Sequence, residues 1–122
     1  ALISRTSIAE SAVTFQTEIE DISMHSSLLF PLGIIINEIV VNALKYAFIG
    51  KKDGKIALTV LRKDSQTMVV VKDDGMGIPD EVMIDKATGF GMQMVRLLVK
   101  QIHSSIDIVK DRGTKYVIKM EA

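Results

Sequence analysis

The sequence predicts an α+β fold: a two-layer α/β sandwich in which helices cover one face of a mixed, mostly antiparallel sheet. Residues 56–62 and 67–73 are strand-like runs separated by four polar residues, which is the pattern of a hairpin. Residues 28–48 form a long, largely apolar segment, and residues 91–103 form an amphipathic one. Both patterns are typical of helices, which favours helices packed on a sheet over an all-β fold.

The individual elements follow from local patterns. A first strand is expected at residues 13–20, where apolar side chains alternate. The helix expected at 28–48 is rich in β-branched residues, so burial rather than intrinsic propensity must stabilise it. A turn is expected at residues 50–54. The remaining elements are expected at residues 56–62 and 67–73 (strands), 91–103 (helix), and 105–110 and 114–120 (a second strand hairpin).

Composition limits the class of protein. With 122 residues and 48% hydrophobic content, residues 1–122 suffice for one globular domain with a core. Lys plus Arg equals Asp plus Glu at 15 each, which argues against nucleic acid as the main partner. No apolar run approaches the ~20 residues that span a bilayer, so we expect no membrane contact by this domain. There is no signal peptide pattern, and the absence of cysteine excludes disulfides.

The most informative motif is an acid followed by two glycines. The β-branched residues 69–71 predict a buried strand that reaches Asp73, and Gly75 and Gly77 follow at alternate positions. An acid at a strand end can accept a hydrogen bond from a ligand amine. Glycines beyond it permit positive φ and let the backbone approach a flat ring. Alone, the motif is also compatible with an ordinary turn.

Upstream of this motif, the apolar helix carries three polar residues at a helical spacing. Glu38, Asn42 and Lys45 are spaced i, i+4 and i+7, which places them on one stripe of an α-helix. Polar groups on a buried helix need hydrogen-bond partners, so the stripe is expected to face a ligand site. The alternative is an ion pair between Glu38 and Lys45 on a solvated face.

Downstream, a Gly-x-Gly turn precedes the amphipathic helix. Gly89 and Gly91 lie where that helix begins. Free N–H groups at a helix N-terminus bind phosphate, and glycines let the backbone contact the anion. Many helices follow a glycine, so this motif is also weak when it stands alone.

In order, spacing and residue type, these three motifs resemble the N, G1 and G2 boxes of the catalytic ATP-binding domain of sensor histidine kinases. That domain belongs to the superfamily of gyrase, the ninety-kilodalton heat-shock chaperone and the mismatch-repair ATPases, whose sandwich is the Bergerat type. The resemblance runs from about Val13 to the C-terminus, and residues 111–118 resemble the closing Gly-Thr and strand. Family members usually begin with another helix. Residues 1–11 are too short for it, so a chain trimmed from a longer protein is expected.

The resemblance implies ATP and Mg²⁺ as cofactors and a role for each motif residue. Asp73 resembles the acid that accepts the adenine amine, and Thr114 the threonine that supports it. Asn42 resembles the ligand of the Mg²⁺ that bridges the phosphates. Tyr46 and Thr114 are also compatible with purely structural roles, as a core aromatic and a strand residue. The other implied contacts are Lys45 (phosphate), Tyr46 (base or sugar), Gly75 and Gly77 (adenine pocket), and Gly89 and Gly91 (the lid hinge).

Glu38 departs from the commonest kinase pattern, which has asparagine there. The resemblance extends to gyrase-type ATPases, to one histidine kinase subgroup and to anti-sigma serine kinases, which carry this acid. Glu38 is therefore the catalytic candidate, and it leaves histidine, serine or water open as the acceptor. The lid, residues 78–88, has only eleven residues, which argues against gyrase and the chaperone.

The resemblance implies a module that transfers the ATP γ-phosphoryl group to a histidine elsewhere. His25 and His103 are each followed by serine rather than an acid, so neither resembles the acceptor. The expected partners are a histidine-bearing dimerisation domain of the same protein and a response regulator. The expected location is the cytoplasm, free or within a membrane-anchored sensor. The alternatives are an anti-sigma-type serine kinase and a nucleotide-binding module without catalytic activity.

Overall fold

The structure, a computed structural model, describes residues 2–8, 11–48, 53–75, 90–110 and 112–121. Within these residues six strands form one sheet in the order β1-β2-β3-β4-β6-β5. Among the described strands β2 and β3 run parallel and the other neighbours run antiparallel. The strands are β1 (Leu2–Ile8), β2 (Ser11–Ile19), β3 (Asp53–Lys63), β4 (Gln66–Asp73), β5 (Ser105–Lys110) and β6 (Thr114–Glu121).

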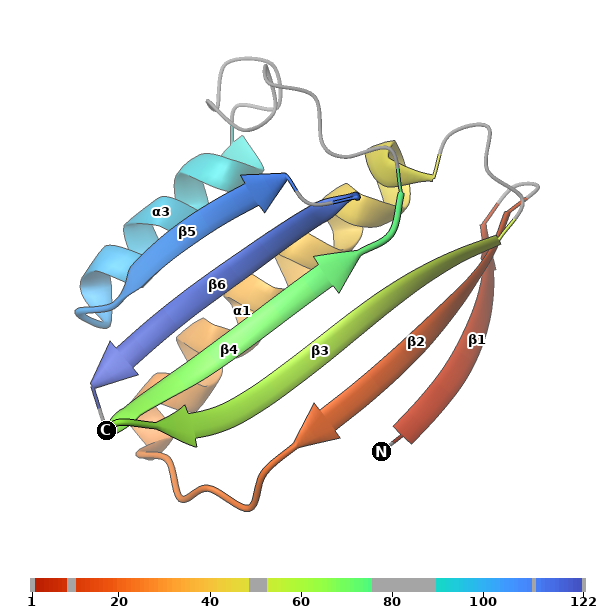
Figure 1. The fold of residues 1–122 in the computed structure, drawn as a ribbon. Coiled ribbons are helices and arrows are strands. Elements are labelled where there is room, and N and C mark those ends of the chain that lie inside the picture. Colours follow the sequence, from red (N-terminus) through yellow and green to blue (C-terminus); the bar gives the residue numbers. More distant parts are fainter. Residues whose placement is uncertain (1, 9–10, 49–52, 76–89, 111, 122) are drawn as a thin grey trace.

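Two helices, α1 (Ser26–Asn42) and α3 (Phe90–Gln101), lie on the same face of this sheet (Figure 1). The predicted two-layer sandwich with a mixed, mostly antiparallel sheet is therefore confirmed. Strand β1 was not predicted. Residues 2–8, for which no element was predicted, pair with β2 in an antiparallel ladder from Leu2↔Thr17 to Ile8↔Ser11. Strand pairing determines the conformation of a segment too short to form a stable helix.

Helix α1 begins and ends in ways that position the site. The His25 side chain caps it, since Nδ1 accepts a hydrogen bond from the Ser27 backbone nitrogen at 3.2 Å. The prediction of one helix to residue 48 was wrong in its last turn, because residues 43–47 form a π-helical turn, η1 (Ala43–Ala47). Single π turns occur often at functional sites. Phe48 then packs its ring where a Cβ on Gly54 would lie, and this contact joins the helix end to β3.

Contrary to the sequence expectation, residues 26–45 form a helical stretch long and apolar enough to cross a membrane, with a mean hydropathy of 1.8. Its inner face, however, supplies Leu32, Ile35 and Ile39 to the core of the domain. The same length and composition therefore suit a core helix, which is how this segment packs here.

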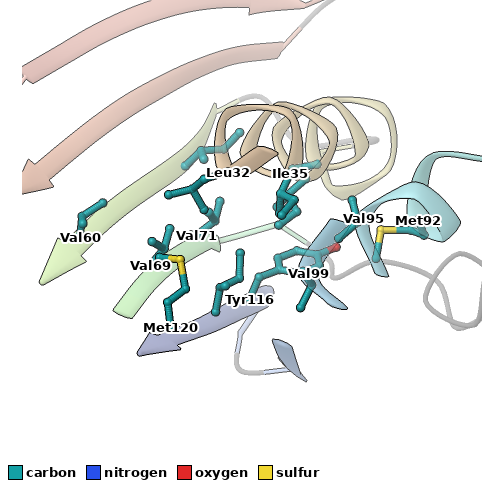
Figure 2. Close-up of a cluster of buried hydrophobic side chains, with 14 of the residues drawn as sticks. Leu32, Ile35, Val60, Val69, Val71, Met92, Val95, Val99, Tyr116 and Met120 are labelled. Carbon is teal, nitrogen blue, oxygen red and sulfur yellow. The ribbon is translucent and has the colours of Figure 1, made fainter. Parts of the chain in front are cut away.

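The core lies between the sheet and the two helices (Figure 2). α3 contributes Met92, Val95 and Val99, and it ends at Gln101 rather than at the predicted residue 103. His103 has a φ of 54° and ends the helix. The Ser104 nitrogen donates to the Val99 carbonyl and the His103 nitrogen to the Lys100 carbonyl, both at 3.0 Å. This pair of bonds is a Schellman cap with histidine in the usual place of glycine.

The predicted β3–β4 hairpin is confirmed. Lys63 pairs with Gln66, and the two residues between them, Asp64 and Ser65, have φ values of 52° and 65°. Two consecutive positive φ values define a type I′ turn, whose twist suits a two-residue hairpin. This hairpin fixes the register of β4 on β3. The register determines which residue lies at the far end of β4, and the candidate site lies at that end of the sheet.

Candidate functional site

The elements that carry the motifs converge at one end of the molecule. The end of β4, the start of β6, the end of α1 and the start of α3 all lie at the upper end in Figure 1. Asp73 ends β4, Thr114 begins β6 and Asn42 ends α1. Gly91 lies in the first turn of α3. Residues from 42 to 114 are thereby brought to one edge of the sandwich.

Asp73 is the best-defined residue of this edge. Its side chain is 2% exposed, and its Cα is paired with that of Thr114, which is fully buried. Asp73 Oδ1 accepts hydrogen bonds from the Gly75 nitrogen at 3.0 Å and from the Thr114 nitrogen at 3.3 Å. These two backbone donors fix the orientation of a buried carboxylate.

Gly113 makes this close approach possible. Its φ is +127°, in the region that side chains rarely adopt. A Cβ at this position would collide with the Asp73 backbone oxygen and lie 3.0 Å from Asp73 Oδ1. The turn before β6 therefore requires glycine, because the backbone there lies directly against the acid.

The neighbouring acid, Asp74, is placed differently. Asp74 is exposed, and its Oδ1 accepts a hydrogen bond from the Lys55 nitrogen at 2.8 Å. The Asp74 nitrogen donates to the Lys55 carbonyl at 3.2 Å. Asp74 thus holds the end of β4 against β3, and the alternation of side chains along the strand turns only Asp73 toward the helices.

On the helical side of the site, Asn42 and Glu38 differ in burial. Asn42 is 4% exposed, and among the described residues its Nδ2 has no hydrogen-bond partner. Glu38 is half-buried, and its Oε2 lies 2.9 Å from where a Cβ on Gly91 would be. The absence of a side chain at Gly91 therefore leaves room for the Glu38 carboxylate beside the first turn of α3. That end of a helix favours negative charge.

Lys45 lies beyond the regular part of helix α1. Lys45 is exposed and lies in η1, where the π turn changes the angular spacing that the prediction used. The side chain of Tyr46 lies outside the described residues, as do Gly77, Gly89 and the lid at residues 78–88.

Sequence reasoning missed Tyr116. This residue of β6 is 1% exposed, and its hydroxyl oxygen has no hydrogen-bond partner among the described residues. Burial raises the pKa of the Tyr116 hydroxyl above its ordinary value, and the negative charge of Asp73 raises that pKa further. Its burial could have been predicted from the alternation of side chains along a strand, because Thr114, Tyr116 and Ile118 occupy alternate positions of β6 and all point inward.

The described residues contain no group of three His, Cys, Asp or Glu side chains that could hold a metal ion by themselves. Mg²⁺ usually takes few protein ligands and completes its coordination with waters and substrate phosphates. The single amide oxygen of Asn42, next to a half-buried Glu38, therefore fits a cation that arrives with a nucleotide better than a permanent metal centre.

Relatives of known function resemble the chain over most of its length. The sensor histidine kinase PdtaS of Mycobacterium tuberculosis is 32% identical over 93 residues, covering 73% of this chain and 19% of the relative. The blue-light-activated histidine kinase 2 of Erythrobacter litoralis is 28% identical over 91 residues, covering 74% of this chain and 26% of the relative. The chain thus spans about a fifth to a quarter of these proteins.

Solved structures agree on the fold. The histidine kinase domain of the Erythrobacter litoralis EL346 blue-light activated histidine kinase has a TM-score of 0.81 and 23% identity, covering 89% of this chain and 51% of that one. The Acinetobacter baumannii histidine kinase AdeS has a TM-score of 0.72 and 17% identity, covering 89% and 54%.

The family comparison is more specific. Residues 30–122 match the model of the family described as histidine kinase-, DNA gyrase B-, and HSP90-like ATPase. The match includes most of α1 with its C-terminal end, Asp73, the first turn of α3 and Thr114, which meet at the candidate site. Since it spans well over half of the sequence, the chain belongs to this ATPase family.

Proposed function

We propose that this chain is the ATP-binding catalytic module of a sensor histidine kinase, which transfers the γ-phosphoryl group of ATP to a histidine on a separate dimerisation domain. The observation that carries the proposal is the buried Asp73 carboxylate, oriented by two backbone N–H groups where four elements of an ATPase-family fold converge. A buried acid held in this way is an acceptor prepared for a donor from a ligand.

In this proposal Asp73 accepts the exocyclic amine of adenine. Gly75 and Thr114 support the acid through their backbone nitrogens, and the Thr114 hydroxyl lies on the same inward face of the sheet. A site built around one amine–carboxylate pair rejects bases that lack the amine, because the buried acid is then left unpaired. Gly77 completes the adenine pocket, with Tyr46 near the base or sugar.

The phosphates would lie between the ends of α1 and α3. Asn42 would hold Mg²⁺ through its side-chain oxygen, and Mg²⁺ when bound neutralises phosphate charge. The first turn of α3 offers free N–H groups to the phosphates, and Gly89 and Gly91 serve as the hinge of the lid. Lys45 is exposed on a long flexible stem, which suits a contact to the terminal phosphate.

Glu38 is the proposed base. The acceptor nitrogen forms a bond to the γ-phosphorus while the bond from that phosphorus to the bridging oxygen breaks, and ADP leaves with the electron pair. Glu38 takes the proton from the other ring nitrogen of the acceptor, which keeps the phosphorylated ring neutral. Its position beside the open backbone of Gly91, at the phosphate end of α3, supports this role.

The phosphoryl group would then pass to a response regulator, in a cytoplasmic location either free or within a membrane-anchored sensor. The resemblance to sensor histidine kinases supports these partners. Because Glu38 also suits a hydroxyl acceptor, an anti-sigma-type serine kinase is the second candidate. A nucleotide-binding module without catalytic activity is the third, and the presence of both a buried, oriented Asp73 and a buried Asn42 argues against a decayed site.

The test uses the full-length protein that contains this chain, incubated with ATP labelled on the γ-phosphate. We expect the protein to become labelled, and we expect acid but not base to remove the label, as is characteristic of phosphohistidine. The label should also be transferred to a response regulator. Acid-stable label would indicate a serine acceptor instead. Nucleotide binding with no label on any residue would contradict a kinase and leave the binding module.

A further inference from the structure

The Tyr116 hydroxyl is a buried polar group that the proposed mechanism does not use. The side chain projects from β6 into the core between the sheet and the helices (Figure 2). Among the described residues the hydroxyl has no hydrogen-bond partner, and the whole side chain is 1% exposed. Such a hydroxyl is destabilising where it stands, because a buried polar atom without a hydrogen bond loses its hydration.

The fold does not need this oxygen. Phenylalanine has the same shape as tyrosine without the hydroxyl, and it would fill the same space in the core equally well. Removing an unpaired buried hydroxyl is neutral or stabilising. Packing therefore does not explain why this position carries a hydroxyl group.

Asp73 is the charged group that acts on Tyr116. Register places them close together, because Tyr116 pairs with Val71 and Thr114 with Asp73, so tyrosine and acid lie on the same inward face, one diagonal step apart. Burial is the larger cause and the charge of Asp73 the smaller one, and both raise the pKa of the Tyr116 hydroxyl, which therefore keeps its proton. Tyr116 thus keeps a neutral O–H group on the same face of the sheet as a carboxylate whose Oδ1 accepts two backbone hydrogen bonds.

We propose that Tyr116 is a positioning residue for base recognition, whose buried hydroxyl supports the Asp73 carboxylate as the acceptor for an amine-bearing base. This inference rests on the proposed nucleotide site and adds a source of its selectivity for adenine. An O–H donor near a carboxylate favours the ionised, acceptor-only form. That form distinguishes adenine, which offers an amine, from hypoxanthine, which offers a carbonyl oxygen at the same position.

The experiment measures the affinity of this chain for a non-hydrolysable ATP analogue and for the matching inosine analogue. The wild type should bind the adenine nucleotide more tightly. In Tyr116→Phe we expect the ratio of the two affinities to fall about two- to fivefold, which is the size of a cross-strand side-chain pair's contribution. In an Asp73→Asn background the same change should leave the ratio unaltered, since the acid through which Tyr116 acts is gone.

Ile118→Val is the matched control. Ile118 is fully buried on the same face of β6, two residues further along, and it carries no polar atom. This change should lower the midpoint of urea unfolding and affect both nucleotides equally, whereas Tyr116→Phe should leave the midpoint unchanged or higher.

An unchanged affinity ratio in Tyr116→Phe, while the wild type discriminates, would overturn the role of Tyr116 and leave the nucleotide site intact. An equal loss for both nucleotides would show that the hydroxyl serves only packing, which also overturns the inference. If the wild type binds neither nucleotide, the proposed function fails and this inference fails with it.

Discussion

Replacing Gly113 by alanine should damage both the fold and the site, because this residue combines two constraints. At a φ of +127° a side chain is strained, which costs about 1–3 kcal/mol. The new Cβ would also collide with the Asp73 backbone oxygen, and relief of such overpacking costs a further ~1–3 kcal/mol. The expected loss of unfolding free energy is therefore about 2–6 kcal/mol, a large part of the stability of a typical domain.

Two other glycines serve as matched controls. A Cβ on Gly33, in α1, would meet nothing within 4 Å, so Gly33→Ala should stabilise the fold by about 0.5–1 kcal/mol through helix propensity alone. A Cβ on Gly91 would lie 2.9 Å from Glu38 Oε2, the far end of a flexible side chain. Gly91→Ala should therefore change stability little and displace the Glu38 carboxylate.

The assay is urea unfolding of the three variants, with nucleotide binding measured by calorimetry on those that fold. We expect Gly33→Ala to be the most stable variant, Gly91→Ala to unfold close to the wild type, and Gly113→Ala to be well below both. Nucleotide affinity should be unchanged in Gly33→Ala and reduced in Gly113→Ala. A Gly113→Ala protein with wild-type stability and affinity would refute the reasoning about the approach of this turn to Asp73.

Further predictions concern the metal, the base and the hydroxyl. Asn42→Ala should weaken Mg²⁺-dependent binding of an ATP analogue roughly tenfold or more and Mg²⁺-free ADP binding much less, as calorimetry with and without Mg²⁺ would show. Glu38→Gln should slow phosphoryl transfer by roughly 10²-fold in a protein that carries the acceptor histidine, with nucleotide affinity little changed. This chain alone should neither label His25 or His103 nor turn ATP over briskly, since transfer depends on placing an acceptor in line with the phosphate. Stability should be retained below pH 10 and fall above it, because the unfolded chain releases the Tyr116 proton near the ordinary pKa of 10.0 while burial raises the pKa of the folded hydroxyl. Tyr116→Phe should make that fall shallower by at most about 1.4 kcal/mol per pH unit in unfolding measured against pH.

The parts of the fold that sequence reasoning predicted are those specified locally. The β3–β4 hairpin was predicted from two strand-like runs and a polar turn, and Asp73 from its place at the end of one of them. A strand followed by an acid and glycines carries its own signal, because strand parity and turn chemistry involve neighbouring residues.

The parts that were not predicted depend on partners distant in the sequence. β1 is a strand because β2 lies beside it, and no periodicity within residues 2–8 indicates which element will pair with it. The π turn in residues 43–47 was not predicted, and it changes the angular spacing on which the expected position of Lys45 depended, because prediction from spacing assumes a regular helix. The sequence around Tyr116 does not indicate that its hydroxyl lacks a hydrogen-bond partner among the described residues, because the surroundings of this hydroxyl depend on the packing of β6 against the helices (Figure 2).

The measurement that tests the central claim most directly is calorimetry of an ATP analogue with Mg²⁺ on the wild type, Asp73→Ala and Asp74→Ala. The two acids are adjacent, but only Asp73 is buried and turned inward, whereas Asp74 holds the Lys55 backbone at the surface. We expect binding by the wild type, little change in Asp74→Ala and loss of binding in Asp73→Ala. Equal affinity in Asp73→Ala and the wild type would contradict the assignment of this buried carboxylate as the adenine acceptor.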